Sequence, residues 1–241
     1  MFDEFSRLIF PIALRQNISY KELLMKCRSD LRVFETVHFF SYSSMSEYSF
    51  HRISQETIGN INFDDCDDLT KLEILKGMTK ATALNLHSSN GVNMLPHACQ
   101  HLCNLRLLYI SNSSVDSLRY LGAHFPKLKE LTLADCNVRD LDGITSFPNL
   151  KILRLPGNEI QSVDQCIHLF QLCHLDVQRN LIDDIASLQW LNLCPKLVSL
   201  VLYGNPLYLS IKEGQPKCTE TDVIKALPKL KYLDGKPLLT L

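Results

Sequence analysis

The sequence predicts a right-handed solenoid of the α/β class, with a parallel sheet on its concave side and short 3₁₀ turns on its convex side. Leucine is concentrated in one part of the 241-residue chain, with 5 in residues 1–68 and 37 in residues 69–241. Apolar residues in the leucine-rich part recur with spacings of 22 to 25 residues. Within each repeat they alternate with the period of two that is typical of a half-buried strand.

The repeated pattern is Leu-x-x-Leu-x-Leu-x-x-Asn-x-Leu, the signature of a leucine-rich repeat. A degenerate first unit contains Ala81, Leu84 and Leu86, and the complete units begin at Leu105, Leu128, Leu150, Leu172 and Leu197. The Leu-x-Leu pair is predicted to point inward from a strand. The Asn is predicted to bond the backbone of a neighbouring coil, and Ser113 and Cys136 replace it in two units. A 22-residue period leaves room for only a short helical turn on the far side.

The chain divides into two predicted parts. Residues 69–241 form the repeat domain, with about six repeats and a C-terminal cap over residues 208–241, where we expect the domain to end. Residues 1–68 form an N-terminal extension. Within it, residues 20–37 have the apolar spacing of one amphipathic helix, which would serve either as a helical cap or as a partner-binding arm.

Composition excludes several functional classes. With 25 Lys and Arg against 26 Asp and Glu, the net charge of −1 argues against an extended nucleic-acid-binding surface. No apolar run approaches the roughly 20 residues of a membrane span, and the N-terminus makes a poor signal peptide. Nine cysteines without a Cys-x-x-Cys pair favour reduced, cytoplasmic thiols. We therefore expect a cytoplasmic protein, monomeric in isolation, that binds neither membrane nor nucleic acid.

No motif for chemistry is present in the sequence. It lacks a phosphate-binding glycine loop, a nucleophile elbow and a zinc-protease helix, so we expect no enzyme and no cofactor. A group of possible metal ligands alternates along one segment: His97, Cys99, His101 and Cys103. Because alternating residues of a helix point in different directions, we expect this segment to pack on the convex side and not to bind a metal ion. The acidic run at residues 64–68 is interpreted as a solvated charge cluster.

The outward face of the predicted sheet is the expected binding surface, since repeat proteins bind partners on curved sheets. Aromatic and charged residues on or beside this face are the predicted protein contacts, because Tyr and Arg dominate interface energetics when buried. They are Tyr109, Arg154, His174, Asp176, Arg179 and Tyr203. The alternative interpretation is a solvated face whose charges pair across neighbouring strands.

Two further features bear on partner binding. The basic residues Arg106, Lys129 and Lys151 stack along one predicted column, with acidic residues such as Glu130 beside them, and this mixed charge fits a protein partner. Trp190, the one Trp, lies in the stretch that lengthens the fifth repeat. It is predicted either to pack on the convex side or to contact a partner.

Three segments between consensus positions carry a closer resemblance. Residues 112–122, 133–147 and 191–197 resemble the family of leucine-rich repeat-containing protein 56, within the short 22-residue repeat class. The resemblance covers roughly residues 69–241, and longer family members carry an extended C-terminal region. It implies a role in the assembly or intraflagellar transport of outer dynein arms. Dynein-arm or intraflagellar transport components would then be the partners, and the cilium or flagellum, or its base, the location.

Two other functions stay open. A regulatory subunit of a protein phosphatase shares the repeat length, and co-purification of a phosphatase catalytic subunit would favour that function. A scaffold subunit of a nucleoprotein particle, in which another subunit contacts the RNA, is similar in size. Loss of the particle on nuclease treatment would favour this second alternative.

Overall fold

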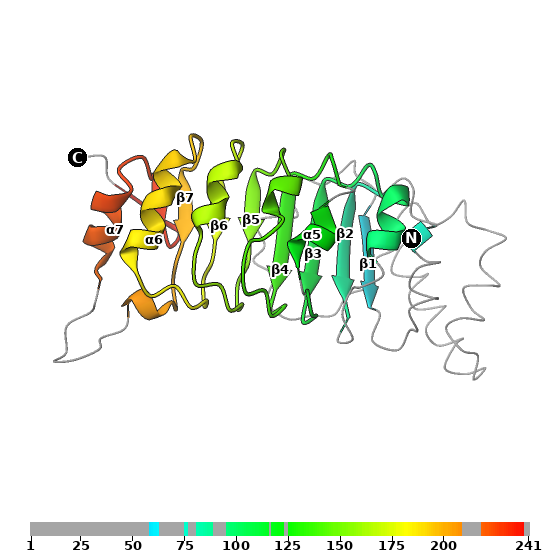
Figure 1. The fold of residues 1–241 in the computed structure, drawn as a ribbon, viewed down its shortest axis with the longest axis horizontal. Helices are drawn as coiled ribbons and strands as arrows, with labels where there is room; N and C mark the ends of the chain where they lie inside the picture. The colour runs from blue at the N-terminus through cyan, green and yellow to red at the C-terminus, as the bar shows by residue number, and fades with distance from the viewer. Residues whose placement is uncertain are drawn as a thin grey trace, which may run out of the picture.

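The repeats form one sheet whose strands follow one another in chain order, as the computed structural model of the chain shows (Figure 1). It describes residues 58–62, 75–76, 81–88, 95–115, 117–122, 125–208 and 218–238. The strands are β1 (Ile58–Asn62), β2 (Ala83–His87), β3 (Leu107–Ser111), β4 (Glu130–Ala134), β5 (Ile152–Arg154), β6 (His174–Asp176), β7 (Ser199–Val201), β8 (Tyr232–Leu233) and β9 (Lys236–Pro237). Strands β1 to β8 pair in parallel, and β9 pairs antiparallel with β8.

Short helical turns return the chain from one strand to the next and form the other layer of the solenoid (Figure 1). The α-helical turns are α4 (Leu95–Ala98), α5 (Leu118–Gly122), α6 (Ile185–Leu188) and α7 (Glu220–Ala226). The 3₁₀ turns are η3 (Cys99–His101), η4 (Ile144–Ser146), η5 (Asp164–His168), η6 (Gln189–Leu193) and η7 (Pro206–Tyr208). The predicted solenoid with short convex 3₁₀ turns is confirmed.

The core lies between the sheet and the helical turns. The inward strand residues Leu131, Leu153 and Leu175 are fully buried, each directly beside its counterpart on the next strand. Burying one such side chain stabilises the fold by about 1.5–3 kcal/mol. Cys136 and Cys166 are buried in the same core, and burial raises the pKa of the Cys136 thiol to about 12. These cysteines therefore act as small apolar groups.

Buried asparagines join neighbouring coils at the predicted position. Asn158 accepts hydrogen bonds from the backbone N–H groups of Cys136 and Val138, both at 3.0 Å, and donates to the carbonyl of Leu133 at 2.7 Å. Asn180 and Asn205 repeat this arrangement one and two coils further on. The buried backbone groups that these asparagines reach thereby have partners, as a closed interior requires.

The two predicted replacements for Asn behave differently. The Cys136 thiol donates weakly to the Ile110 carbonyl of the preceding coil at 3.5 Å, as well as to the Ala134 carbonyl of its own coil at 3.2 Å, so it keeps part of the arrangement. The buried Ser113 hydroxyl has no hydrogen-bond partner among the described residues, which corrects the prediction that it joins the asparagine ladder. A serine side chain is too short to reach the groups that an Asn side chain bonds.

The C-terminal segment adds the last parallel strand to the sheet and then covers the edge of that strand. Helix α7 begins at a capping box in which the Thr219 hydroxyl and the Asp222 carboxylate each accept the other residue's backbone N–H. Strand β8 then extends the sheet, and the Asp234 carboxylate accepts from the backbone N–H groups of Leu202 and Tyr203 at 2.6 and 2.9 Å. Asp234 thus accepts backbone hydrogen bonds from the last complete coil, as the asparagines accept them from the earlier coils.

The sheet reaches further toward the N-terminus than the sequence repeats indicate. Strand β1 pairs with β2 and lies upstream of residue 69, inside the segment assigned to the N-terminal extension. The predicted helix over residues 20–37 and the acidic run over residues 64–68 lie outside the described residues. In the part of the chain that is described, no helix has the length and apolar character to cross a membrane.

Candidate functional site

The outward strand residues form two columns across β2 to β7, in the register that the sequence predicts, and a third column that extends only over β2 to β4. We call this surface the concave face. Its first column contains Ala83, Leu107, Glu130, Ile152, His174 and Ser199, and its middle column contains Asn85, Tyr109, Thr132, Arg154, Asp176 and Val201. The columns combine apolar, aromatic and charged side chains. A surface of this composition suits a protein segment better than a small polar ligand.

Arg154 lies at the centre of the charged part of the concave face. Its Nη1 is 3.5 Å from Oε2 of Glu130 on β4, and Asp176 occupies the same column on β6. The Arg154 and Glu130 side chains keep 28% and 33% of their surface exposed. An ion pair this accessible contributes about 0–1 kcal/mol to stability. Cross-strand pairing is therefore present, as the alternative interpretation expects, while the guanidinium remains reachable by a carboxylate of a partner.

Burial controls the ionisation of His174. Its Nδ1 is 2.8 Å from the Ser199 hydroxyl on the neighbouring strand. Burial, together with the positive charge of Arg154, lowers the pKa of His174 to about 4. The ring is therefore neutral at physiological pH and presents a hydrogen-bonding group instead of a charge.

Asp176 is the least accessible of the predicted contacts, with 7% of its surface exposed. Its carboxylate accepts hydrogen bonds from the backbone N–H of Gln178 at 3.0 Å and from the Gln178 side-chain amide at 3.2 Å. Burial raises the pKa of Asp176, and the bonds to Gln178 and the charge of Arg154 oppose that rise. Asp176 consequently presents little of its own surface on the concave face.

Tyr109 defines a less polar part of the face, toward the N-terminal end. It is half-buried on β3, next to Thr132 on β4, and Leu107 precedes it in the first column. Burial raises the pKa of the Tyr109 phenol, so its hydroxyl stays protonated at physiological pH. Together, Leu107 and Tyr109 provide an apolar and aromatic contact area.

Arg179 and Tyr203 lie beside the concave face, in the turns that follow β6 and β7. The two turns are adjacent, because the Arg179 backbone N–H donates to the Tyr203 carbonyl at 2.8 Å. Arg179 has a positive φ of 52°, and its side chain runs past Gly204. Tyr203 is 68% exposed. The structure thus places four of the six predicted contacts on the sheet and two at the edge where the strands end.

Glu130 and Ser199 contact two of the predicted residues but were not themselves among the residues predicted from the sequence. Glu130 pairs with Arg154, and Ser199 holds the ring of His174. Both occupy outward positions directly beside a predicted contact, so the strand register was a signal that could have identified them.

The remaining sequence features have different surroundings. His97 and Cys103 are exposed, and His101 lies 3.3 Å from the Gln100 side chain. Among the described residues, no three metal-ligating side chains converge. Trp190 lies on η6, on the helical side of the solenoid, and half of its surface is exposed.

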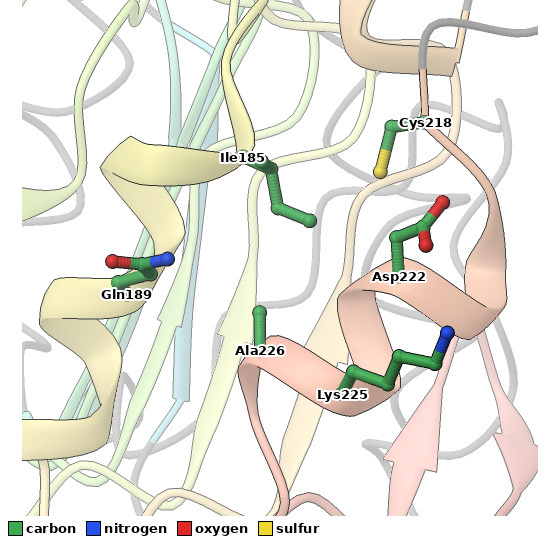
Figure 2. Close-up of a pocket in the computed structure, with 6 residues that line it drawn as sticks. All are labelled: Ile185, Gln189, Cys218, Asp222, Lys225 and Ala226. Atoms are coloured by element: carbon green, nitrogen blue, oxygen red, sulfur yellow. The ribbon is translucent and has the colours of Figure 1, made fainter.

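A groove of about 440 Å³ lies between α6 and α7, away from the concave face (Figure 2). Its lining residues are Ile185, Gln189, Cys218, Asp222, Lys225 and Ala226. The Asp222 carboxylate is bonded to Thr219 within the capping box, and burial raises the pKa of the Cys218 thiol. The groove therefore holds a protonated thiol and an already bonded carboxylate, which is not the arrangement of a nucleophile and its base.

The stacked coils, the asparagine ladder and the exposed parallel sheet define the chain as a leucine-rich-repeat protein. Proteins of this class are interaction modules that present an extended sheet to a partner. No family model matches the chain. A leucine-rich-repeat protein of Leptospira interrogans has a similar fold, with a TM-score of 0.50 and 22% identity over 67% of this chain and 38% of that chain.

The chain is similar to leucine-rich repeat-containing protein 56 of mammals, which confirms the resemblance predicted from its sequence. The rat protein is 38% identical over 151 residues, which are 60% of this chain and 28% of the rat protein. The human protein is 37% identical over 143 residues, which are 57% of this chain and 26% of the human protein. The matched region is thus little more than a quarter of each relative.

Proposed function

We propose that the chain is a non-catalytic adaptor that holds a protein segment on its concave face, and that it acts in the assembly or intraflagellar transport of outer dynein arms. The combination of an accessible guanidinium and a half-buried aromatic ring on one rigid sheet is the observation that carries the adaptor function. The resemblance to leucine-rich repeat-containing protein 56 is what supports the dynein-arm role. In this proposal the protein works in the cytoplasm, at the cilium or flagellum or its base.

The geometry of the face indicates what kind of segment would bind. Tyr109 on β3 and Arg154 on β5 occupy the same column two strands apart, a separation of about 9.6 Å. Residues seven positions apart on a helix are separated by about 10.5 Å along its axis. A partner helix with an apolar residue and a carboxylate at that spacing would contact Tyr109 and Arg154 together, and its carboxylate would replace or join Glu130.

Two substitutions on the concave face test the adaptor function. The variant Tyr109→Ala with Arg154→Ala removes both anchors. Trp190→Ala with Arg139→Ala is the matched control, because it removes an exposed aromatic and an exposed arginine that both lie off the concave face. Tagged full chains are expressed in ciliated cells, and co-purified proteins are identified by mass spectrometry after thermal unfolding has shown that each variant is folded.

The expected result is that dynein-arm or intraflagellar transport components co-purify with the wild type and the control and are lost from the Tyr109 and Arg154 variant. Retention of these partners by a folded double variant would contradict binding on the concave face. Localisation of the tagged chain away from cilia and their bases would contradict the dynein-arm role. Recovery of a phosphatase catalytic subunit, or of a nuclease-sensitive particle, would instead support one of the two alternative functions.

A further inference from the structure

Seven exposed basic side chains line the edge of the solenoid at which the strands begin. We call this edge the basic rim. Its members, each in the turn that leads into a strand, are Arg106, Lys127, Lys129, Lys151, Lys196, Lys229 and Lys231. The described residues at the equivalent positions of all these coils include no Asp or Glu. Although the net charge of the chain is only −1, this edge therefore carries a row of positively charged residues.

Backbone hydrogen bonds fix the members of the rim beside one another. The Lys129 N–H donates to the Arg106 carbonyl, and the Lys151 N–H donates to the Lys129 carbonyl, both at 2.8 Å. The ladder continues through Cys173 and Val198 to Lys231. Each step is one strand spacing of about 4.8 Å. Like charges held at this distance are unfavourable to one another, and a bound anionic group would relieve the repulsion.

The lysines of the rim have neutral partners or none in the described part of the chain. The ammonium groups of Lys127 and Lys196 donate to the side-chain oxygens of Asn104 and Gln171, at 2.8 and 2.5 Å. Two exposed arginines elsewhere on the surface have carboxylate partners: Arg119 pairs with Asp142, and Arg139 pairs with Glu159 at 3.0 Å. The charges of the rim lysines are thus not balanced by ion pairs of the kind that Arg119 and Arg139 make.

An exposed aromatic ring interrupts the row. Phe170 is 62% exposed and occupies the turn position that proline fills in four other coils, for example Pro148 and Pro195. The same coil has Cys173 where the preceding coil has Lys151. Along the edge, the rim therefore has lysines on both sides of one apolar anchor. An aromatic side chain in such a setting is the kind of residue that dominates interface energetics.

We propose that the basic rim is a second interaction surface, which binds an acidic peptide segment of a partner protein with an apolar side chain at its centre. Five strand spacings separate Arg106 from Lys231, about 24 Å, which an extended segment of about seven residues spans. Carboxylates on both sides of the apolar residue would meet the lysines, and the apolar residue would cover Phe170.

The surroundings of the rim favour a peptide over a flat or thick polyanion. Glu130 directly follows Lys129 on the adjoining concave face, and Asp176 lies on that face two strands further on. A bilayer or a nucleic acid that covered the rim would also bring its phosphates toward these carboxylates. A single peptide chain can follow a row one residue wide and avoid them.

Fluorescence anisotropy with a synthetic probe tests this proposal. The probe is a labelled peptide of about ten residues, rich in Glu and Asp with one central Phe, long enough to span the rim. It is titrated with the full chain and with three variants: Lys129→Glu with Lys151→Glu, Phe170→Ser, and Lys225→Glu with Lys236→Glu. The last is the charge control, since it makes the same charge change on the exposed cap; it also removes the ion pair of Lys236 with Glu220, so thermal unfolding first shows that each variant is folded.

We expect the rim double variant to weaken binding at least about tenfold, Phe170→Ser to weaken it several-fold, and the control to stay near wild type. Binding should also fall as salt rises. Equal weakening by the rim variant and the control would overturn the proposal, and so would the absence of peptide binding. Binding of anionic vesicles or of an oligonucleotide to the rim in place of the peptide would overturn it as well. Tyr109→Ala with Arg154→Ala should leave peptide binding intact, which separates this test from that of the concave face.

Discussion

Replacing Asn180 by Ala would remove one connection between two coils. The Asn180 side chain accepts from the Ile160 N–H at 3.0 Å and donates to the Leu155 carbonyl at 2.7 Å, both in the preceding coil. It also donates to the Val177 carbonyl, but Val177 keeps a second bond from Asn205. With only 3% of Asn180 exposed, water cannot readily replace the lost partners.

The magnitude follows from the backbone groups left without a partner. Asn180→Ala orphans one N–H, of Ile160, and one C=O, of Leu155. A buried unsatisfied polar group costs about 1–3 kcal/mol, so we expect a loss of about 4 kcal/mol in the free energy of unfolding. That is a large part of the roughly 5–15 kcal/mol by which a domain is stable.

Urea unfolding followed by circular dichroism measures this loss. Asn149→Ala is the control, because its side-chain amide also donates to a carbonyl, that of Pro126 at 2.9 Å, but in an exposed position. It should cost less than about 1 kcal/mol. Equal losses for the two variants would refute the idea that the buried ladder connects the coils.

The pKa of His174, about 4 in the folded chain against an ordinary 6.5, makes stability pH-dependent. Since the unfolded chain binds the proton first, this stability is fully present above pH 6.5 and is lost as pH falls toward 4. We expect a loss of about 1–2 kcal/mol that His174→Gln abolishes, measured by unfolding at several pH values; an unchanged pH profile would contradict it. Gly143→Ala should cost about 3 kcal/mol or more, because its φ is +89° and a new Cβ would lie 2.3 Å from the Arg119 backbone nitrogen. Gly235→Ala, with φ +76° and open space around the Cβ, should lower the free energy of unfolding by only about 1 kcal/mol. Equal losses for the two glycine variants would contradict the steric explanation.

The strand register could be predicted because two independent signals agree. The inward leucines, such as Leu131 and Leu153, recur with the repeat and alternate with period two, so a shift of one residue would expose every one of them. The outward positions of Tyr109 and Arg154 follow directly. Four of the six predicted contacts therefore lie on the face to which the sequence assigned them.

Strand β1 could not be recognised from the repeat pattern. Its register pairs Gly59 with Leu84 and Ile61 with Leu86. A glycine thus stands where the pattern requires an inward leucine, and the hydrophobic alternation is lost. Tertiary pairing with β2 forms this strand, which a sequence pattern alone does not reveal.

The edge of the site was harder to predict than its centre. Strands β5 to β7 are three residues long, whereas β2 to β4 have five. The residue with a positive φ occupies the same repeat position after the longer strands, at Asn112 and Asp135, as after the shorter ones, at Gly157, Arg179 and Gly204, so it does not account for the difference in length. Tyr203 follows the end of the short strand β7 and lies on a turn. The partners of Arg154 and His174 depend on side-chain conformations, which a repeat consensus does not encode.

The antiparallel strand β9 has a consequence for how this solenoid could change in length. A parallel coil can be added only to a strand edge that offers the register of the next repeat, and β9 occupies that edge beside β8. An extra 22-residue unit therefore fits between two existing coils, where each new face meets a matching one, but not beyond β9. Duplication or engineered lengthening should succeed at internal repeats and fail at the cap.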